Sequence, residues 1–202
     1  MTKVIGITGG IGSGKTTLSE YLKKTGFLVH ESDKVVSSIY NKPKKSFINF
    51  IKKNLSKEVI QKGKVDKKKI INIIFNNNKI KNKLEKYIHK EVQVSRENFI
   101  KKNLKAKKKI IFVDIPLLLE NKLEKKFDLV FCVISTKKNR TKRVLKNKKF
   151  TKKILNKIFS VQTTDKERRA RSHIIINNNK TKKDFIFNVE QVLKGIFKWE
   201  KL

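Results

Sequence analysis

A glycine-rich motif near the start of the chain limits the available folds more than any other feature. Residues 9–17 read Gly-Gly-Ile-Gly-Ser-Gly-Lys-Thr-Thr and fit the pattern G-x-x-x-x-G-K-[ST] of a phosphate-binding loop. The short apolar run at residues 3–8 predicts a buried strand before the motif. A helix is predicted after it, ended by Gly26, a residue type that takes the left-handed cap conformation. This order of strand, glycine loop and helix predicts a site for a nucleoside triphosphate.

The residue types of the motif suit phosphate chemistry. Glycines let backbone N–H groups converge on an anion, and the start of the helix adds its positive end. Lys15 is expected to reach the β- and γ-phosphates, and the Thr16 hydroxyl is expected to bind Mg²⁺. The alternative is a glycine-rich turn that fits the pattern by chance, which the flanking strand and helix disfavour.

Length and cysteine content bound the class of protein. A chain of 202 residues predicts one domain, with room for a small insertion. The single cysteine, Cys132, excludes an internal disulfide, and its apolar surroundings favour a buried, unreactive thiol. No apolar run reaches the roughly 18 residues of a membrane span, and Met1 leads into the first predicted strand without a signal peptide. A cytoplasmic location and no membrane partner are the simplest expectations.

The net charge of +35 permits two interpretations. A basic surface is typical of proteins that bind nucleic acid. However, lysine is spread through nearly every segment, arginine is sparse, and no basic stripe interleaved with aromatic residues occurs. We therefore favour compositional drift and no specific nucleic-acid partner, although the charge should attract anionic substrates.

Two carboxylates follow predicted strands. Residues 27–30 predict a second strand with Asp33 after it, and residues 110–114 predict a buried strand that ends at Asp114. In an open α/β sheet, ligands bind at the carboxyl ends of the strands, so Asp33 is expected near the phosphate loop. Asp114 has the position of a metal-directed carboxylate. Asp33 has a second interpretation as the cap of a helix predicted from residue 34.

The chain between these strands is predicted to be helical. From Pro43 to about residue 106, apolar residues recur at helical spacing and no strand pattern interrupts them, which indicates a helical insertion that covers a substrate. His89 lies in this insertion and, on its own, reads as a packed or surface histidine. Residues 129–134 and 174–177 predict two more buried strands, and the apolar pattern at residues 185–197 predicts an amphipathic terminal helix.

Residues 136–171 form a polar, basic stretch. Arg140 and Arg143 lie three residues apart, on one face of a predicted helix, and more arginines follow after Gln162. We expect a lid that brings guanidinium groups to a transferring phosphoryl group. A solvated pair of helices is the alternative.

Taken in order, these residues resemble the bacterial dephospho-coenzyme A kinase family over nearly the whole chain. The Thr-Gly-Gly-Ile-Gly-Ser-Gly-Lys opening and the segment Pro-Leu-Leu-Leu-Glu at residues 116–120 are together specific. Further matching residues are Asp33, Leu84 and Glu85 with His89, Arg143, Gln162, and Ile176 with Asn178.

The resemblance implies a P-loop NTPase fold of the nucleoside-monophosphate-kinase type. This is a three-layer α/β fold with a five-stranded parallel sheet. The expected core comprises residues 1–33, 107–136 and 172–202, with a helical substrate-binding insertion at about 34–106 and a lid at about 137–171.

The resemblance also implies an ATP-dependent phosphotransferase. It would transfer the γ-phosphate of ATP to the 3′-hydroxyl of dephospho-coenzyme A, the last step of coenzyme A synthesis, with ATP and Mg²⁺ as cofactors. Together with the arguments above, it assigns catalytic roles to Asp33, Lys15, Arg143 and Arg140, ATP contacts to Gly12, Ser13, Gly14, Lys15, Thr16, Thr17 and Asn178, metal contacts to Thr16, Asp33 and Asp114, and an acceptor contact to His89.

The lid departs from the family pattern at one charge. The family tends to have glutamine at the position of Arg140 and arginine at the position of Asn147. We expect Arg140 to supply that charge from the preceding helical turn.

Two other functions stay open on the sequence alone. A P-loop ATPase that binds nucleic acid would fit the charge and would show hydrolysis stimulated by RNA or DNA, with a steep dependence on salt. A kinase of another nucleotide-like metabolite would fit the same core, because the acceptor pocket has no self-evident sequence code. The sequence does not indicate an oligomeric state.

Overall fold

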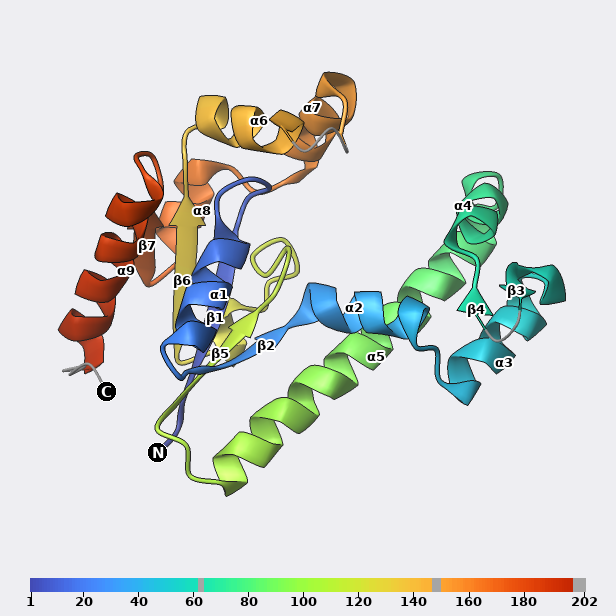
Figure 1. Cartoon of the computed structure of the whole chain (residues 1–202), viewed down its shortest axis with the longest axis horizontal. Helices are drawn as coiled ribbons and strands as arrows, with labels where there is room; N and C mark the ends of the chain where they lie inside the picture. Colours follow the sequence, from blue (N-terminus) through green and yellow to red (C-terminus); the bar gives the residue numbers. More distant parts are fainter. Residues whose placement is uncertain (62–63, 147–149, 198–202) are drawn as a thin grey trace. The chain divides into compact units, whose positions relative to one another are not determined.

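The chain forms two compact units. The computed structural model describes residues 1–61, 64–146 and 150–197. The core unit comprises Met1–Glu31 and Lys102–Leu202, and the helical unit comprises Ser32–Lys101. The helices and strands of both units are labelled in Figure 1.

A five-stranded sheet organises the core unit, with strand order β2-β5-β1-β6-β7 and every neighbouring pair parallel. Parallel strands covered on both faces are apolar along their whole length, so short runs of β-branched residues identify them in a sequence. All five were predicted, and the second begins and ends one residue later than expected. They are β1 (Lys3–Gly9), β2 (Leu28–Glu31), β5 (Ile110–Asp114), β6 (Leu129–Ile134) and β7 (Ile174–Asn177).

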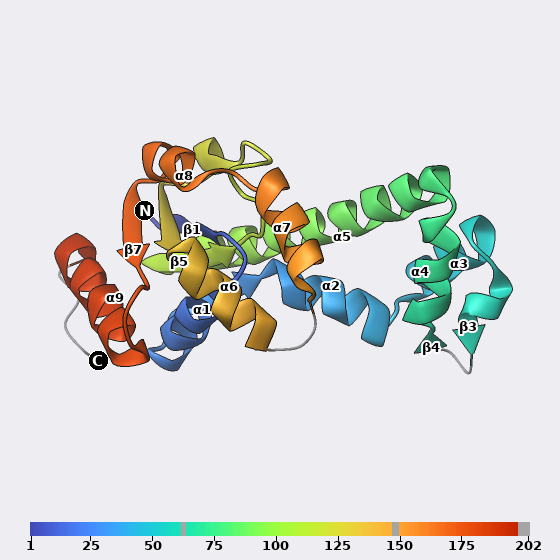
Figure 2. The same ribbon diagram turned by 90° about the horizontal axis from the view of Figure 1, so that it is seen from above.

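Helices cover both faces of this sheet. Helices α1 (Lys15–Lys24) and α9 (Lys182–Phe197) lie on one face, and α8 (Asp165–Arg171) lies on the other beside β6 (Figure 2). The apolar core between the sheet and the first pair is formed by Ile5, Ile7, Leu18, Leu22, Phe112, Phe131, Val133, Ile176, Phe185, Val189 and Leu193. The fold is the predicted three-layer α/β arrangement.

Two more helices complete the polar stretch before α8. Helix α6 (Lys137–Lys146) follows β6, and α7 (Lys152–Val161) begins at Thr151, whose side chain accepts a hydrogen bond from the N–H of Ile154. Helix α8 begins with a capping box between Thr164 and Glu167. These three helices occupy the residues predicted as a lid, and the movement of that lid stays a prediction. A short 3₁₀ helix, η2 (Glu124–Lys126), precedes β6.

The helical unit has its own apolar core. Its helices are α2 (Ser32–Asn41), α3 (Lys45–Asn54), α4 (Lys67–Phe75) and α5 (Asn78–Lys105), the last of which continues past Lys101, together with the 3₁₀ helix η1 (Lys57–Val59). The buried residues are Phe47, Ile51, Val59, Val65, Ile70 and Leu84. Helical spacing of apolar residues predicted these helices correctly.

One expectation for the helical unit was wrong. Strands β3 (Ile60–Gln61) and β4 (Lys64–Val65) pair as an antiparallel hairpin inside the stretch expected to contain no strand. Strands of two residues are too short to show an alternation of apolar and polar positions, so the sequence pattern could not reveal them.

The single cysteine is a buried thiol, as expected. Cys132 is inaccessible to solvent within β6, and it forms no disulfide. Burial raises the pKa of its thiol to about 11, which keeps it protonated and unreactive at neutral pH. Within the part of the chain that the structure describes, no helix combines the length and the apolar character that a membrane crossing requires.

Candidate active site

The glycine motif forms a loop between β1 and α1. Gly9 ends the strand and Lys15 is the first residue of the helix, at the carboxyl edge of the parallel sheet. The backbone N–H groups of Gly12, Gly14, Lys15 and Thr16 donate no hydrogen bond to any residue in the described ranges. The first amides of a helix lack intrahelical partners and favour an anion. The loop therefore fits the polyphosphate of ATP.

The carbonyl groups of the loop are held by two side chains. Arg143 Nη1 donates to the carbonyl oxygens of Gly12 and Ser13, each at 3.4 Å, and Asn178 Nδ2 donates to the Ser13 oxygen at 2.7 Å. Arg143 is itself held by Ser135 Oγ at 3.2 Å and by the Asn178 carbonyl at 2.9 Å. In a planar trans peptide, the C=O and the N–H point in opposite directions. Fixing the Ser13 carbonyl therefore also orients the N–H of Gly14.

Lys15 lies beside the carboxylate at the end of β5. Lys15 Nζ donates to Asp114 Oδ1 at 2.9 Å, and Ser19 Oγ donates to Asp114 Oδ2 at 2.9 Å. The register of β1 and β5 pairs Ile7 with Asp114, which brings this carboxylate to the loop. Mg²⁺ binds oxygen ligands and needs only one or two from the protein when phosphates supply others. Asp114 and the exposed Thr16 hydroxyl meet that requirement.

Arg140 lies beside the loop at Gly10, where an added Cβ would lie 2.3 Å from Arg140 Nη1, and it also contacts groups outside the loop. Its side chain is 7% exposed, its Nη2 lies 3.4 Å from Asp165 Oδ2, and its guanidinium lies 5.0 Å from the centre of the Phe159 ring. Asp165 also pairs with the buried Arg168, whose Nη1 lies 2.7 Å from Oδ1. Burial lowers the pKa of Arg140 from its usual value. A solvated helical face does not fit a buried arginine, and the predicted contact with phosphate stays a prediction.

Ten of the twelve predicted site residues lie in the core unit, and the roles inferred for them stay predictions; the ten are Gly12, Ser13, Gly14, Lys15, Thr16, Thr17, Asp114, Arg140, Arg143 and Asn178. Arg143 and Asn178 contact the loop, and Lys15 contacts Asp114. Asn147, the position at which the family tends to have arginine, lies outside the described residues.

The other two predicted residues belong to the helical unit. Asp33 is exposed and is the second residue of α2, which begins at Ser32. The expectation that Asp33 caps a helix starting at residue 34 therefore misplaced the helix start, and Asp33 lies in the first turn, where the helix dipole stabilises a carboxylate. His89 is exposed on α5.

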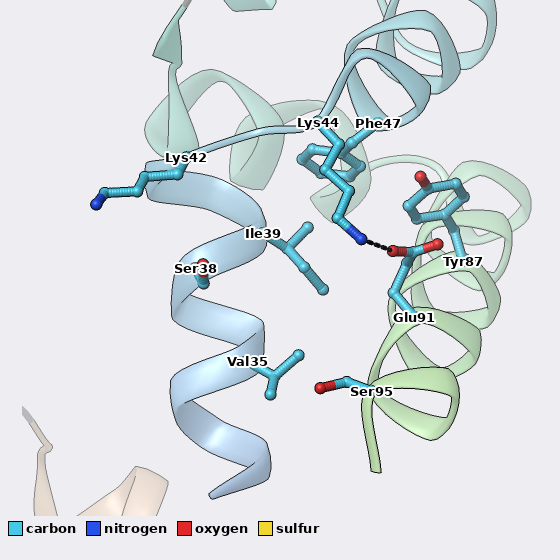
Figure 3. A pocket seen from close by; sticks show the side chains of 9 residues that line it. All are labelled: Val35, Ser38, Ile39, Lys42, Lys44, Phe47, Tyr87, Glu91 and Ser95. Atoms are coloured by element: carbon cyan, nitrogen blue, oxygen red, sulfur yellow. Dashed lines mark hydrogen bonds and ion pairs between the residues drawn. The ribbon is translucent and has the colours of Figure 1, made fainter. Parts of the chain in front are cut away.

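The helical unit contains a cavity of about 100 Å³ between α2, the start of α3 and α5 (Figure 3). Val35 and Ile39 point into it, and Lys44 Nζ lies 3.5 Å from Glu91 Oε2 across it (Figure 3). Its lining residues are Val35, Ser38, Ile39, Lys42, Lys44, Phe47, Tyr87, Glu91 and Ser95. Val35, Ile39 and Phe47 form an apolar side of the cavity, and the other lining residues bring hydroxyl and charged groups. A mixture of apolar and polar groups suits a small organic molecule with polar ends.

The sequence did not indicate two residues that contact the site, Ser19 and Ser135, or one contact of Gln162. Ser19 follows Lys15 by one helical turn and faces the sheet, and helical spacing alone could have suggested it. Ser135 is a polar residue directly after an apolar strand, which is a recognisable signal at the carboxyl edge. Gln162 was noted, but its hydrogen bond to the loop N–H of Ile11 was not foreseen.

A substitution at Gly14 tests the loop geometry. Gly14 has φ +109°, and a Cβ there would lie 2.1 Å from Asn178 Nδ2. We expect Gly14→Ala to strain the backbone and push Asn178 off the Ser13 carbonyl, which weakens ATP binding by about tenfold or more. Calorimetric titration with ATP measures the change. Gly195→Ala on α9 is the matched control, because its Cβ would meet no atom of the described part of the chain within 4 Å. Equal ATP affinity in Gly14→Ala and the wild type would contradict the loop assignment.

Comparison with known proteins identifies relatives over nearly the whole chain. Residues 3–184 match the family model of dephospho-CoA kinase. The chain is 35% identical to a dephospho-CoA kinase of Fusobacterium nucleatum over 196 residues, which cover 96% of this chain and 98% of that protein. It is 32% identical to a dephospho-CoA kinase of Bartonella henselae over 198 residues, which cover 96% of this chain and 100% of that protein.

Solved structures share the fold. A dephospho-CoA kinase from Campylobacter jejuni superposes with a TM-score of 0.74 at 24% identity, with 98% of each chain covered. A shikimate kinase from Acinetobacter baumannii superposes with a TM-score of 0.52 at 13% identity, covering 98% of this chain and 96% of that one. These similar structures confirm the predicted P-loop kinase fold. The match of residues 3–184 to the family model also identifies the family. This chain belongs to the dephospho-CoA kinase family.

Proposed function

We propose that the protein transfers the γ-phosphate of ATP to the 3′-hydroxyl of dephospho-coenzyme A, with ATP held in the phosphate loop of the core unit. The observation that carries the proposal is the loop itself. Its N–H groups at Gly12, Gly14, Lys15 and Thr16 donate no hydrogen bond within the described ranges, while its carbonyls are held by side chains. Phosphoryl transfer depends mainly on positioning and charge neutralisation, which such a loop supplies.

Lys15 and Asp114 would exchange partners when ATP binds. Lys15 Nζ, now 2.9 Å from Asp114 Oδ1, would move its hydrogen bonds to the β- and γ-phosphate oxygens. The freed carboxylate and the Thr16 hydroxyl would then be oxygen ligands for Mg²⁺, which neutralises phosphate charge when bound. Arg143 would keep the loop carbonyls in place and would add positive charge near the phosphates.

Asp33 is the proposed acceptor of the hydroxyl proton. Glu31 ends β2 and pairs with Asp114 in the sheet register, and Asp33 follows two residues later. Two residues of chain span at most about 7 Å, so the Asp33 backbone stays near the carboxyl edge. The 3′-oxygen would attack the γ-phosphorus, its proton would pass to Asp33, and the bond from that phosphorus to the oxygen of the leaving ADP would break.

The acceptor is proposed to use the helical unit. The cavity has an apolar side, formed by Val35, Ile39 and Phe47, that suits part of the pantetheine arm. Lys44 reaches across the cavity to Glu91 and Lys42 extends away from it (Figure 3), and the positive charge of both side chains suits an anionic diphosphate. His89 on α5 keeps its predicted contact with the acceptor as part of this proposal.

Filling the cavity tests this assignment. We expect Val35→Phe to raise the KM for dephospho-coenzyme A by about tenfold, because the larger ring takes space from the arm, while the KM for ATP stays unchanged. Ser37→Phe, at an exposed position on the same helix that does not line the cavity, is the matched control. Steady-state kinetics with dephospho-coenzyme A and with AMP, an acceptor that lacks the arm and is not a product formed from ATP, measure the KM for each acceptor. A higher KM for both acceptors, or for neither, would argue against the cavity as the arm site.

A panel assay tests the function itself. ADP release is followed with ATP and, in turn, dephospho-coenzyme A, nucleoside monophosphates and RNA. We expect turnover with dephospho-coenzyme A and a product that is one phosphate heavier by mass spectrometry. Turnover with a nucleoside monophosphate alone would identify a different kinase. Hydrolysis that depends on RNA would identify a nucleic-acid-stimulated ATPase, the function that the charge alone suggests.

A further inference from the structure

Gln162 links the end of α7 to the phosphate loop. Its backbone N–H donates to the carbonyl of Ile158 at 3.2 Å and so ends the helix. Its side-chain Oε1 accepts a hydrogen bond from the N–H of Ile11 at 3.1 Å, between residues 151 positions apart. None of the roles proposed above uses this residue.

The hydrogen bond fixes one peptide plane of the loop from both sides. The peptide between Gly10 and Ile11 has its N–H on Gln162, and its carbonyl accepts a hydrogen bond from the N–H of Ser13 at 3.1 Å. A planar peptide held at both ends cannot rotate about the axis of the chain. The residues that follow it supply the N–H groups proposed to bind phosphate, so the orientation of this peptide sets where those groups point.

Glu120 fixes the backbone beside Gln162. Glu120 Oε1 accepts a hydrogen bond from the N–H of Thr163 at 2.9 Å, and it lies 3.7 Å from Nη2 of the buried Arg168. Thr164 then begins α8 with its capping box. The backbone on both sides of Gln162 is thus anchored, which limits the positions that its side chain can take. Glu120 is the last residue of the Pro-Leu-Leu-Leu-Glu segment, which otherwise has no assigned role.

We propose that Gln162 is a positioning residue for phosphoryl transfer. Anchored at Thr163 by Glu120, it holds the Gly10–Ile11 peptide through Oε1 and thereby sets the loop amides for phosphate. The inference rests on the proposed function, because it requires ATP in the loop. Gln162 binds a backbone N–H of the loop and Arg143 binds backbone carbonyls of the loop. Both residues belong to the predicted lid, which therefore contacts the donors and the acceptors of the loop backbone.

Two substitutions at Gln162 test whether its side-chain oxygen Oε1, which accepts the hydrogen bond from Ile11, is the atom that matters. Gln162→Met keeps the length of the side chain and adds no charge, but it removes the carbonyl oxygen. Gln162→Glu keeps an oxygen that can accept from Ile11 and removes the Nε2 donor. Each variant is measured by steady-state kinetics, by thermal unfolding, and by NMR hydrogen exchange at the Ile11 amide. The last measurement reports on the contact without depending on activity.

We expect Gln162→Met to lower kcat by roughly ten- to a hundredfold. Without the hydrogen bond to Ile11, the loop N–H groups would no longer hold the phosphates in the geometry that transfer requires. The KM for ATP should change less, and the Ile11 amide should exchange faster than in the wild type. Gln162→Glu should restore the slow exchange of Ile11. Wild-type kcat in Gln162→Met would overturn the proposal. A loss of kcat with unchanged exchange at Ile11 would also overturn it, since Gln162 would then act by another route.

The anchor and a control complete the experiment. Glu120→Ala removes the acceptor for the N–H of Thr163, so we expect a smaller loss of kcat and a smaller increase in hydrogen exchange at Ile11 than in Gln162→Met. Glu120→Gln keeps an acceptor, so both quantities should be close to the wild-type values. Gln93→Met is the matched control, because Gln93 is exposed on α5 and, among the residues that the structure describes, donates only to Glu97, at 2.8 Å. If the wild type does not phosphorylate dephospho-coenzyme A, the proposed function fails. If it does and the Gln162 variants match it, this inference alone fails.

Discussion

Lys15→Ala is expected to lower kcat by roughly two orders of magnitude or more, in line with the loss of one preorganised charge at the transferring phosphoryl group. Lys15 is the first residue of α1 and directly follows the glycine loop, so the glycines and their amides stay in place when its side chain is truncated. Its cation would be missing where negative charge builds up during transfer. Steady-state ADP release measures kcat, and circular dichroism monitors the fold.

The ion pair of Lys15 with Asp114 calls for a careful control. Truncation also removes a partner from a carboxylate that is 7% exposed, although Ser19 still donates to it. Lys23→Ala is the matched variant, because Lys23 lies on the same helix and also pairs with a carboxylate, that of Glu31, but has no proposed contact with phosphate. A loss of stability shared by both variants with a loss of kcat confined to Lys15→Ala is the expected pattern. Near wild-type turnover in folded Lys15→Ala would rule out the phosphate-loop assignment.

Asp33→Asn is expected to abolish most turnover, with a fall in kcat of about a hundredfold or more, while the melting temperature hardly changes. Asparagine keeps the size of the side chain and its ability to accept a hydrogen bond. It loses the negative charge and the basicity that a proton acceptor needs. Because Asp33 is exposed in the first turn of α2, its replacement leaves the apolar core of the helical unit intact.

Asp66→Asn provides the comparison for this variant. Asp66 is the N-cap of α4 and accepts hydrogen bonds from the N–H groups of Lys68 and Lys69, at 2.9 and 3.2 Å. It therefore has a structural role at a helix start and no proposed role in chemistry. Normal kcat is expected in Asp66→Asn. If Asp33→Asn instead loses stability and keeps kcat, Asp33 acts only on the helix.

The features that the sequence revealed are those that depend on local pattern. The three central strands β1, β5 and β6 are buried along most of their length, so each reads as a short apolar run. The bounds expected for the strand at residues 110–114 match the structure at both ends. The phosphate loop was recognisable because its glycines, lysine and threonine lie within one continuous segment. Gly26 has φ +87° at the end of α1, as its residue type predicted.

Contacts between distant segments could not be read in this way. Arg140 and Arg143 have the same side chain and lie on one helix, yet only Arg143 has a described hydrogen bond to the loop carbonyls. Arg140 packs beside Gly10 and is buried against Asp165 and Phe159. The two arginines differ in the residues that they contact in the folded chain, and no local sequence pattern predicts those contacts. The same holds for Gln162 and Ile11, whose hydrogen bond depends on how the segment after α7 packs.

The strand order has a consequence for how the chain folds. In the sheet, β1 pairs with β5 and β6, and β2 pairs with β5, so neither of the first two strands pairs with the other. During synthesis, both must wait for β5 at residues 110–114, by which point the whole helical unit, Ser32–Lys101, has already been made. That unit has an apolar core of its own and so can begin to fold first. The carboxyl edge that carries the phosphate loop forms only when β1 and β2 pair with β5, which closes a long loop of chain. Because closing this loop costs conformational entropy, we expect the pairing of these strands to be the slow step of folding.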